Sequence, residues 1–268
     1  MPFQRLLFTL FIGFTVWGLS SCSTYQQVLK GSDVKQKYEY AKKYYESRNY
    51  SKAMPLLEEV MIYVRGQKEA EDVYYMYAMS YAGMKDYQSG YYYFSSFGSS
   101  YPQSKYSEEA AYMAGYCLAM DSPRDELEQS STIGAIAELQ SFVNRYPASP
   151  RVEKCNQLIE GLRAKLETKA FRNAKQWYHI QYYNSAIVAF KNFMNDFPDS
   201  NLDSEAGYFL ILSSYKYAFN SVEEKKKERY EDAIKYYYTF ADRFKNSTRI
   251  KDAEALYNLC QKELNRLN

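Results

Sequence analysis

The sequence predicts an all-α protein, a superhelical solenoid of about five helix pairs followed by a C-terminal capping helix. Three observations support this prediction. Glycine and proline are scarce, at 11 and 7 of 268 residues, which disfavours a turn-rich β-sandwich. One apolar stripe with helical spacing recurs five times along the chain. Four of the five stripes end in the same short turn.

The recurring stripe is a small residue followed by apolar residues 4, 7 and 11 positions later. These steps place all four side chains on one face of a helix. Five copies in register predict five repeated units, each with one helix that buries the same face. The copies are Ala53-Leu57-Val60-Val64, Gly90-Phe94-Phe97-Tyr101, Ala135-Leu139-Phe142-Tyr146, Ala186-Phe190-Phe193-Phe197 and Ala233-Tyr237-Phe240-Phe244.

The turns that end the last four stripes share an aromatic residue, a proline in three of the four, and a serine. Proline cannot donate the next helical hydrogen bond, and the serine can cap the following helix. The pattern therefore predicts helix-turn-helix junctions. They are Tyr101-Pro102-x-Ser104, Tyr146-Pro147-x-Ser149, Phe197-Pro198-x-Ser200 and Phe244-Lys245-x-Ser247.

A partner helix precedes each stripe. Its signature is a small residue with an aromatic residue three positions later, as in Ala41 and Tyr44, and it resembles that of tetratricopeptide repeats. The small residue lets two helices approach closely, and the aromatic ring fills the gap beside it. The other copies are Ala78 with Tyr81, Ala174 with Trp177, and Ser214 with Tyr217 before an insertion at 220–229; the third unit carries a loop at 121–131 and lacks a clear signature, and a last helix is expected at 250–267.

The amino terminus predicts a secreted, lipid-anchored protein. Arg5 precedes an apolar run at 6–19, which is too short to span a bilayer comfortably and ends in small residues before Cys22. The sequence Leu19-Ser20-Ser21-Cys22 resembles a bacterial lipoprotein box. The resemblance implies cleavage before Cys22 and a covalent diacylglycerol and N-acyl lipid on this residue. We therefore expect a signal peptide at 1–21, a lipidated tether at 22–33 and the solenoid at 34–268.

Composition disfavours nucleic-acid binding and catalysis. The chain holds 34 basic and 32 acidic residues, so no basic surface is implied. Its one histidine, His179, has no nucleophile elbow near it and cannot build the usual zinc site alone. We expect no enzyme activity, no metal and no cofactor. Cys117, Cys155 and Cys260 follow helical apolar patterns, which indicates buried thiols, although a single disulfide stays open.

The inner face of the first helix in each unit is the candidate binding surface. A concave wall of tyrosine, methionine and lysine suits an extended peptide or a partner helix, the alternative being a merely solvated face. Lys35, Asp72, Ala82 and Lys175 lie on the same faces as the candidate groove residues. Those candidates are Tyr38, Lys42, Tyr45, Tyr75, Met79, Phe171 and Tyr178.

The order of these features resembles the BamD-like family of outer-membrane β-barrel assembly lipoproteins. The stretch Glu128-Gln129-Ser130-Ser131-Thr132 is similar to an Asp-Gln-Thr stretch of that family. The resemblance implies a scaffold anchored in the outer membrane of a Gram-negative bacterium and facing the periplasm. It would bind a BamA-type barrel protein and unfolded outer-membrane proteins, with the amino-terminal units receiving substrate segments.

Two other classes remain open from the sequence. A SusD-type surface lipoprotein also uses tetratricopeptide helices, but it binds glycans on aromatic platforms and is usually much longer. A periplasmic cell-wall or division adaptor would more often lack the lipid and carry a coiled coil, and no sustained heptads occur here. The direction in which the anchor faces separates glycan binding from periplasmic scaffolding.

Overall fold

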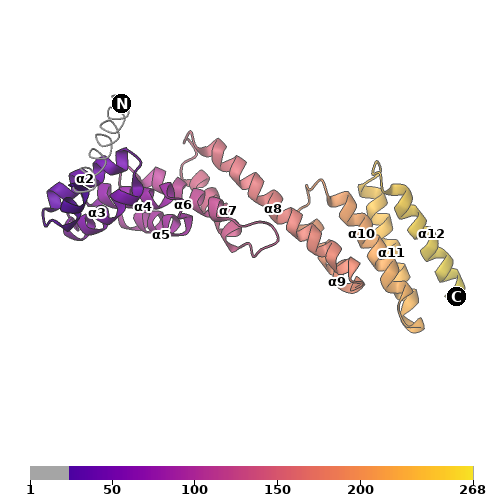
Figure 1. Ribbon diagram of the computed structural model, residues 1–268. Coiled ribbons are helices and arrows are strands. Elements are labelled where there is room, and N and C mark those ends of the chain that lie inside the picture. The colour runs from indigo at the N-terminus through magenta and orange to yellow at the C-terminus, as the bar shows by residue number, and fades with distance from the viewer. Residues whose placement is uncertain (1–23, 268) are drawn as a thin grey trace, which may run out of the picture. The chain divides into compact units, whose positions relative to one another are not determined.

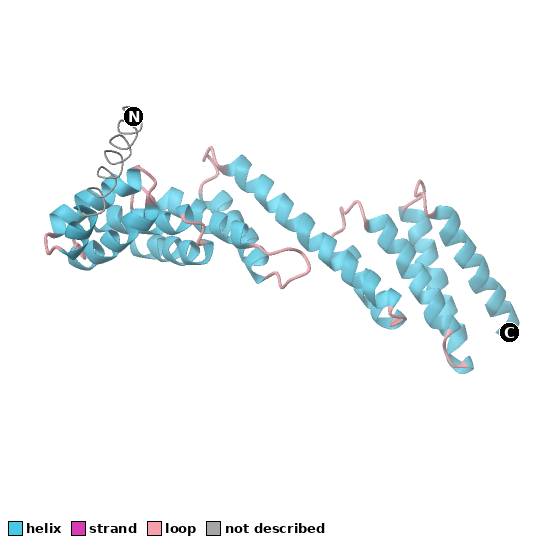
Figure 2. Ribbon diagram, viewed as in Figure 1, coloured by secondary structure: helices cyan, strands magenta, loops and turns pink. Residues whose placement is uncertain are grey.

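The computed structural model describes residues 24–267, and within this range every regular element is a helix (Figure 2). The predicted all-α fold is confirmed. The predicted signal peptide and Cys22 lie outside the described residues. Residues 24–30 are helical. They are followed by α2 (Val34–Glu46), α3 (Tyr50–Tyr63), α4 (Ala70–Gly83), α5 (Tyr87–Ser100), α6 (Ser107–Asp121), α7 (Ser130–Arg145), α8 (Val152–His179), α9 (Tyr183–Asp196), α10 (Asp203–Phe219), α11 (Glu223–Arg243) and α12 (Ile250–Leu267), labelled in Figure 1.

The described chain divides into two compact units. Residues up to 123 and Ser130–Ile159 form unit 1, whereas Arg124–Gln129 and the residues from Glu160 on form unit 2. In unit 1, α2 packs on α3, α4 on α5, and α6 on α7. In unit 2 the second half of α8 packs on α9, α10 packs on α11, and α12 covers the last pair. These are the five pairs and the capping helix that the sequence predicts.

The repeated stripe forms the core in both units. Ala53, Leu57 and Val60 on α3 have no exposed surface, and Phe190 on α9 and Phe240 on α11 are exposed by no more than 2%. The last residue of each later stripe is half-buried at the helix end. Burying each of these large side chains contributes about 1.5–3 kcal/mol relative to leaving it in water.

The predicted serine junctions adopt one geometry four times. In each, the serine hydroxyl oxygen accepts a hydrogen bond from the backbone N–H two residues later, and the serine N–H donates to the carbonyl of the preceding aromatic residue. The aromatic N–H in turn closes the last turn of its own helix. These N–H to serine Oγ hydrogen bonds are Tyr106 to Ser104 (3.2 Å), Arg151 to Ser149 (3.2 Å), Leu202 to Ser200 (2.9 Å) and Arg249 to Ser247 (3.1 Å).

The turns inside three helix pairs also repeat one motif. Arg48, Lys85 and Gln181 follow α2, α4 and α8 with φ of 58°, 64° and 65°. The next N–H in each turn donates back to the carbonyl of the aromatic signature residue, for example from Asn49 to Tyr44 at 2.8 Å. This is the Schellman arrangement, which satisfies the free carbonyls of a helix end. The carbonyl of the aromatic signature residue therefore accepts the hydrogen bond that closes the end of each of these three helices.

The small signature residues Ala41, Ala78 and Ala174 are fully buried, as predicted. The aromatic partners differ from the prediction in one unit. Tyr44 and Tyr81 are half-buried, but Trp177 is 41% exposed. Its ring packs on Tyr182 in the following turn, with the ring centroids 5.9 Å apart, because the helix ends two residues after it.

The loop between α6 and α7 is held by a buried glutamine. Gln129 is 4% exposed, and its side-chain amide donates to the carbonyls of Arg124 and Leu127 at 2.8 and 2.9 Å. Lys169 of α8 donates to the Leu127 carbonyl at 2.6 Å, and Arg172 pairs with Asp125 at 2.8 Å. Gln129, in the stretch that carries the family resemblance, thus shapes this loop, and the neighbouring residues Asp125 and Leu127 attach it to α8.

Candidate functional site

A cavity of about 430 Å³ opens on unit 1 where the first helices of three successive pairs meet. We call it the tyrosine pocket. α2 and α4 supply two of its walls, and the turn before α6 together with the first turn of that helix supplies the third. Its lining is Tyr38, Lys42, Tyr45, Glu46, Asp72, Tyr75, Met76, Lys105, Tyr106 and Glu109.

The helical register accounts for the first wall. Tyr38, Lys42 and Tyr45 are spaced by four and three residues, so all three lie on one face of α2. The buried Ala41 beside them packs that helix into the core. The same spacing brings Asp72, Tyr75 and Met76 to the facing side of α4. The pocket therefore lies on the predicted inner face of the first helices.

A stacked pair of tyrosines forms the floor. The rings of Tyr75 and Tyr106 lie 4.1 Å apart and are inclined by only 5°. Behind them, Tyr75 makes edge contacts with Phe94 and Phe97 of the core at 6.3 and 6.1 Å between centroids. Tyr75 is 7% exposed, so core packing holds its ring in place. The floor is a preformed aromatic surface.

Two carboxylates of the pocket lining form ion pairs, one with Lys105 of the lining and one with Arg151 outside it. Lys105 Nζ lies 3.0 Å from Asp72 Oδ1, and Arg151 lies 2.9 Å from Glu109 Oε1. Burial opposes ionisation of Asp72, but hydrogen bonds from Tyr106 and Lys105 outweigh it and hold the pKa of Asp72 below its usual range. Lys42 is exposed and has no carboxylate within ion-pair distance among the described residues. Its ammonium group is free to meet a ligand.

The pocket tyrosines stay protonated at neutral pH. Burial, with smaller contributions from nearby acidic groups and tyrosines, raises the pKa of Tyr45 to about 12. Burial and the charge of Asp72 also raise the pKa of Tyr38 above its ordinary value. Each phenol can therefore donate a hydrogen bond, while the carboxylates of Glu46 and Glu109 accept. The arrangement suits a ligand with both carbonyl and amide groups and an apolar side chain, such as an extended peptide.

Four of the seven predicted groove residues meet in this pocket: Tyr38, Lys42, Tyr45 and Tyr75. Met79 lies on α4 outside the lining and packs partly buried against the core that contains Phe94 and Phe97. The other two candidates belong to unit 2.

Phe171 is a core residue of unit 2. It is 9% exposed and contacts Phe190 and Phe193 at 6.1 and 5.4 Å between ring centroids. Tyr178 is half-buried and packs edge-on against Phe209 at 5.4 Å. Within unit 2, Phe171 packs α8 against α9, and Tyr178 packs α8 against α10, the first helix of the next pair.

The third wall of the pocket is absent from the sequence prediction. Lys105, Tyr106 and Glu109 surround the start of α6, in the unit whose first helix lacks a clear signature. The repeated serine junctions contain a sequence signal for part of this wall. Tyr106 occupies the position that is Arg151, Leu202 or Arg249 in the other three, so the junction places a variable side chain at each helix start.

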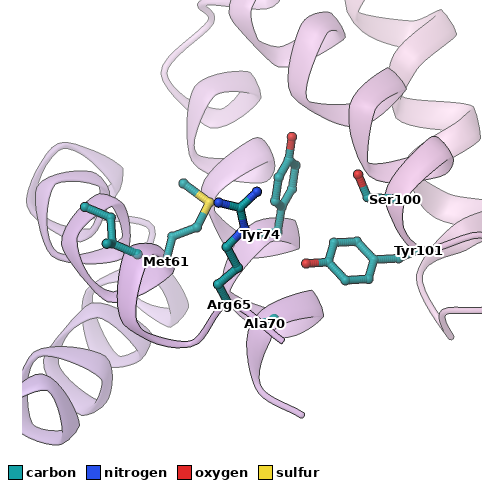
Figure 3. A pocket seen from close by; sticks show the side chains of 7 residues that line it. Met61, Arg65, Ala70, Tyr74, Ser100 and Tyr101 are labelled. Carbon is teal, nitrogen blue, oxygen red and sulfur yellow. The ribbon is translucent and has the colours of Figure 1, made fainter. Parts of the chain in front are cut away.

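A second cavity of unit 1, about 390 Å³, lies between the ends of α3 and α5 and the start of α4. Figure 3 shows the Arg65 side chain between Met61 and Tyr74, with Ser100 and Tyr101 across the opening. The rings of Tyr74 and Tyr101 lie 6.0 Å apart. No pattern in the sequence predicts this cavity, because its lining comes from the ends of three helices.

The described residues contain no cluster of three or more His, Cys, Asp or Glu side chains suited to a metal ion. Among residues 24–267, no helix has both the length and the apolarity needed to cross a membrane. The predicted lipidation residue, Cys22, lies outside this range.

Comparison with known proteins gives one family. The family model YfiO, described as an outer membrane lipoprotein, matches residues 30–175, which is more than half of the chain. This range covers all of the tyrosine pocket and the loop that Gln129 holds. No curated protein matches the chain.

Proposed function

Because the chain belongs to the YfiO family of outer membrane lipoproteins, we propose that it is a non-catalytic scaffold for outer-membrane β-barrel assembly. It faces the periplasm, binds a BamA-type barrel protein, and receives segments of unfolded outer-membrane proteins in the tyrosine pocket. The single observation that carries the binding role is this preformed pocket on the amino-terminal unit.

The anchor in this proposal is a lipid on Cys22. The other three cysteines of the chain, Cys117, Cys155 and Cys260, are each exposed by no more than 1% and lie within helices. A buried thiol in a helix cannot carry an acyl chain without unfolding its surroundings. Cys22 is the remaining cysteine of the sequence, and it follows the apolar segment and small residues of a lipoprotein box.

The pocket favours binding over chemistry. Its described lining contains phenols, carboxylates and ammonium groups, but no serine, cysteine or histidine that could act as a nucleophile beside a base. Tyrosine offers a large ring with a polar tip and few rotatable bonds, which makes it a frequent anchor at binding surfaces.

Site-directed photocrosslinking tests the proposal in cells. A photoreactive phenylalanine analogue replaces Tyr38 in the pocket, and a matched control replaces Tyr92, which is 63% exposed on α5 of the same unit. We expect Tyr38-dependent adducts with unfolded outer-membrane barrel proteins and none at the control position. Affinity capture of the lipidated chain, after brief crosslinking, should recover a BamA-type partner.

Other results would point elsewhere. Equal adducts at both positions contradict a specific pocket. Capture of glycan transporters in place of a barrel-assembly protein supports the SusD-type alternative, and capture of division proteins supports the adaptor.

Charge reversal gives an independent measurement. Lys42→Glu adds a second carboxylate beside Glu46 and removes the free ammonium group, so peptide binding should weaken by at least about tenfold, or about 1.4 kcal/mol. Lys43→Glu is the matched control, because Lys43 is one residue away on α2 but does not line the pocket. Fluorescence titration with an unfolded barrel segment measures both variants.

A further inference from the structure

The helical segment 24–30 is firmly attached to unit 1. Val28 is 3% exposed within the core formed by α2 and α3. The buried ammonium group of Lys37 donates to the Leu29 carbonyl at 2.9 Å and forms an ion pair with Glu59. Tyr25 packs edge-on against Tyr44 at 5.5 Å between ring centroids. The start of this segment is therefore fixed beside the turn that joins α2 and α3.

The chain leaves unit 1 very close to the proposed lipid. Cys22 precedes Thr24 by two residues, and two residues span at most about 7 Å even when fully extended. The headgroup layer of one leaflet is itself about 5–8 Å thick. A lipid on Cys22 thus brings the surface around Thr24 to the level of the phospholipid headgroups.

The surface at this exit combines tyrosine rings with unpaired basic groups. We call it the anchor-side patch, formed by Tyr25, Tyr40, Lys43, Tyr44, Arg48 and Lys52. The Lys52 ammonium lies 5.5 Å from the ring centres of both Tyr25 and Tyr44, and Lys43 lies 5.9 Å from that of Tyr40. Arg48 occupies the turn between α2 and α3 and is exposed.

The basic groups of the patch are not neutralised by ion pairs. Among the described residues, none of Lys43, Arg48 and Lys52 has a carboxylate within ion-pair distance, although many other basic residues of the chain do. Residues 24–32 add Lys30 and no acidic residue. Tyrosines at the headgroup level with lysine and arginine beside them are the composition that membrane interfaces favour.

We infer that the anchor-side patch docks unit 1 onto the surface of the bilayer that holds the lipid, through anionic phospholipid headgroups. The inference rests on the proposed lipidation of Cys22. The lipid keeps the chain at the membrane, and the patch sets which side of unit 1 faces it. The tyrosine pocket uses Tyr38, Lys42 and Tyr45 of α2, whereas the patch uses Tyr40, Lys43 and Tyr44 of the same helix. Docking therefore leaves the pocket lining free of lipid contact.

Quenching of tryptophan fluorescence by a brominated lipid tests the inference on the full lipidated chain. Trp17 lies in the predicted signal peptide, so Trp177→Phe leaves the mature chain without tryptophan. In this background Tyr40→Trp reports from the patch, and Tyr92→Trp on α5 is the matched control. Each protein is reconstituted in vesicles of phosphatidylethanolamine and brominated phosphatidylglycerol. We expect strong quenching of Tyr40→Trp and little quenching of Tyr92→Trp.

Charge reversal then tests the role of the basic groups. Adding Lys43→Glu, Arg48→Glu and Lys52→Glu to the Tyr40→Trp chain should abolish most of the quenching while flotation with vesicles is kept. Unchanged circular dichroism shows that the variant is folded. Equal quenching of the two reporters, in a chain that floats, overturns the docking surface. A chain that has no lipid by mass spectrometry and does not float overturns the lipidation of Cys22, and docking with it.

Discussion

Tyrosine is the side chain that characterises this protein, with 31 in 268 residues. Its ring and its hydroxyl serve different purposes at equivalent positions. Tyr38, Tyr75 and Phe171 each lie three residues before a buried alanine of the repeat signature. Tyr75 contacts Phe94 and Phe97 as Phe171 contacts Phe190 and Phe193. The ring at this position is structural in both units, and only a tyrosine adds a polar group at the surface.

The buried thiols give a prediction at the scale of single residues. Burial, followed by the charge of Asp121, raises the pKa of Cys117 to about 12, and burial raises that of Cys260 to about 12. Because the thiolate is the reactive form, we expect both residues to resist thiol reagents in the folded lipidated chain and to react once urea unfolds it. The measurement is the rate of modification by a chromogenic disulfide reagent.

Ser95→Cys provides the reference rate, because Ser95 is exposed on α5. Modification of Cys117 in native protein at the rate of this exposed thiol would contradict the burial. A disulfide between native cysteines, detected by mass spectrometry, would also contradict it, since all three are free thiols in the structure.

At the scale of elements, the third helix pair packs closely although its first helix lacks the repeat signature. The first helix of that pair, α6, lacks the expected aromatic pattern but places Gly115 against α7. A Cβ at this position would lie 2.8 and 2.9 Å from side-chain atoms of Leu139 and 3.1 Å from its backbone nitrogen. Leu139 is itself fully buried, so the neighbouring helix has little room to move.

Gly115→Ala should therefore destabilise unit 1. The overlap costs about 1–3 kcal/mol and exceeds the gain of about 1 kcal/mol that alanine gives inside a helix. Gly98→Ala on α5 is the matched control, since no atom of a neighbouring element lies within 4 Å of the place its Cβ would take, and it should stabilise by up to about 1 kcal/mol. Urea unfolding followed by circular dichroism measures both. Equal midpoints for the two variants would show that α6 and α7 are not in tight contact.

The elements that the sequence predicts well are those with local causes. A stripe on one helix face and a serine after a turn act within about a dozen residues, and both recur in the structure. The predicted helix cap is wrong in one respect: Ser104 and Ser200 accept from the N–H of Tyr106 and Leu202, the residues just before the helices, so each serine closes the turn and does not cap the first turn of the helix. The third wall of the tyrosine pocket could not be foreseen in this way. Lys105, Tyr106 and Glu109 reach α2 only because α4 lies between them, and this proximity is a property of the packed repeats. The helical periodicity predicts Phe171 on the groove face of its helix. In the structure this face packs against α9, so Phe171 contacts Phe190 and Phe193.

The length of α8 was also not foreseen. Its first residues follow the serine junction at Ser149, and its last residues carry the signature of the fourth pair, yet it is one helix of 28 residues. No proline interrupts it, and Gly161 inside it has open space around it. The sequence between the two patterns contains no signal to stop, so a single helix contributes Cys155 and Ile159 to unit 1 and Ala174 to unit 2.

At the scale of the whole molecule, the many buried phenols and thiols make stability depend on alkaline pH. Burial raises the pKa of Tyr45 and of Tyr230 to about 12. It also raises the pKa of the Cys117 and Cys260 thiols to about 12. In the unfolded chain these groups ionise near their ordinary values, about 10 for tyrosine and about 8.5 for cysteine. The folded state then holds more protons than the unfolded state, so stability falls as pH rises. The stabilisation is complete below about pH 8.5 and is lost progressively up to about pH 12.

We expect the urea midpoint to be nearly constant at neutral pH and to fall steeply above about pH 10, where the unfolded tyrosines ionise. Phenolate absorbance should appear in two steps, first from exposed rings and then together with loss of helical circular dichroism. Tyr45→Phe removes one raised pKa and should lessen the alkaline loss by on the order of 1 kcal/mol while changing neutral stability little. Tyr92→Phe, at an exposed ring, should leave the pH profile unchanged. A midpoint that stays constant to about pH 12 would mean that the buried hydroxyls ionise as freely in the folded chain as in water.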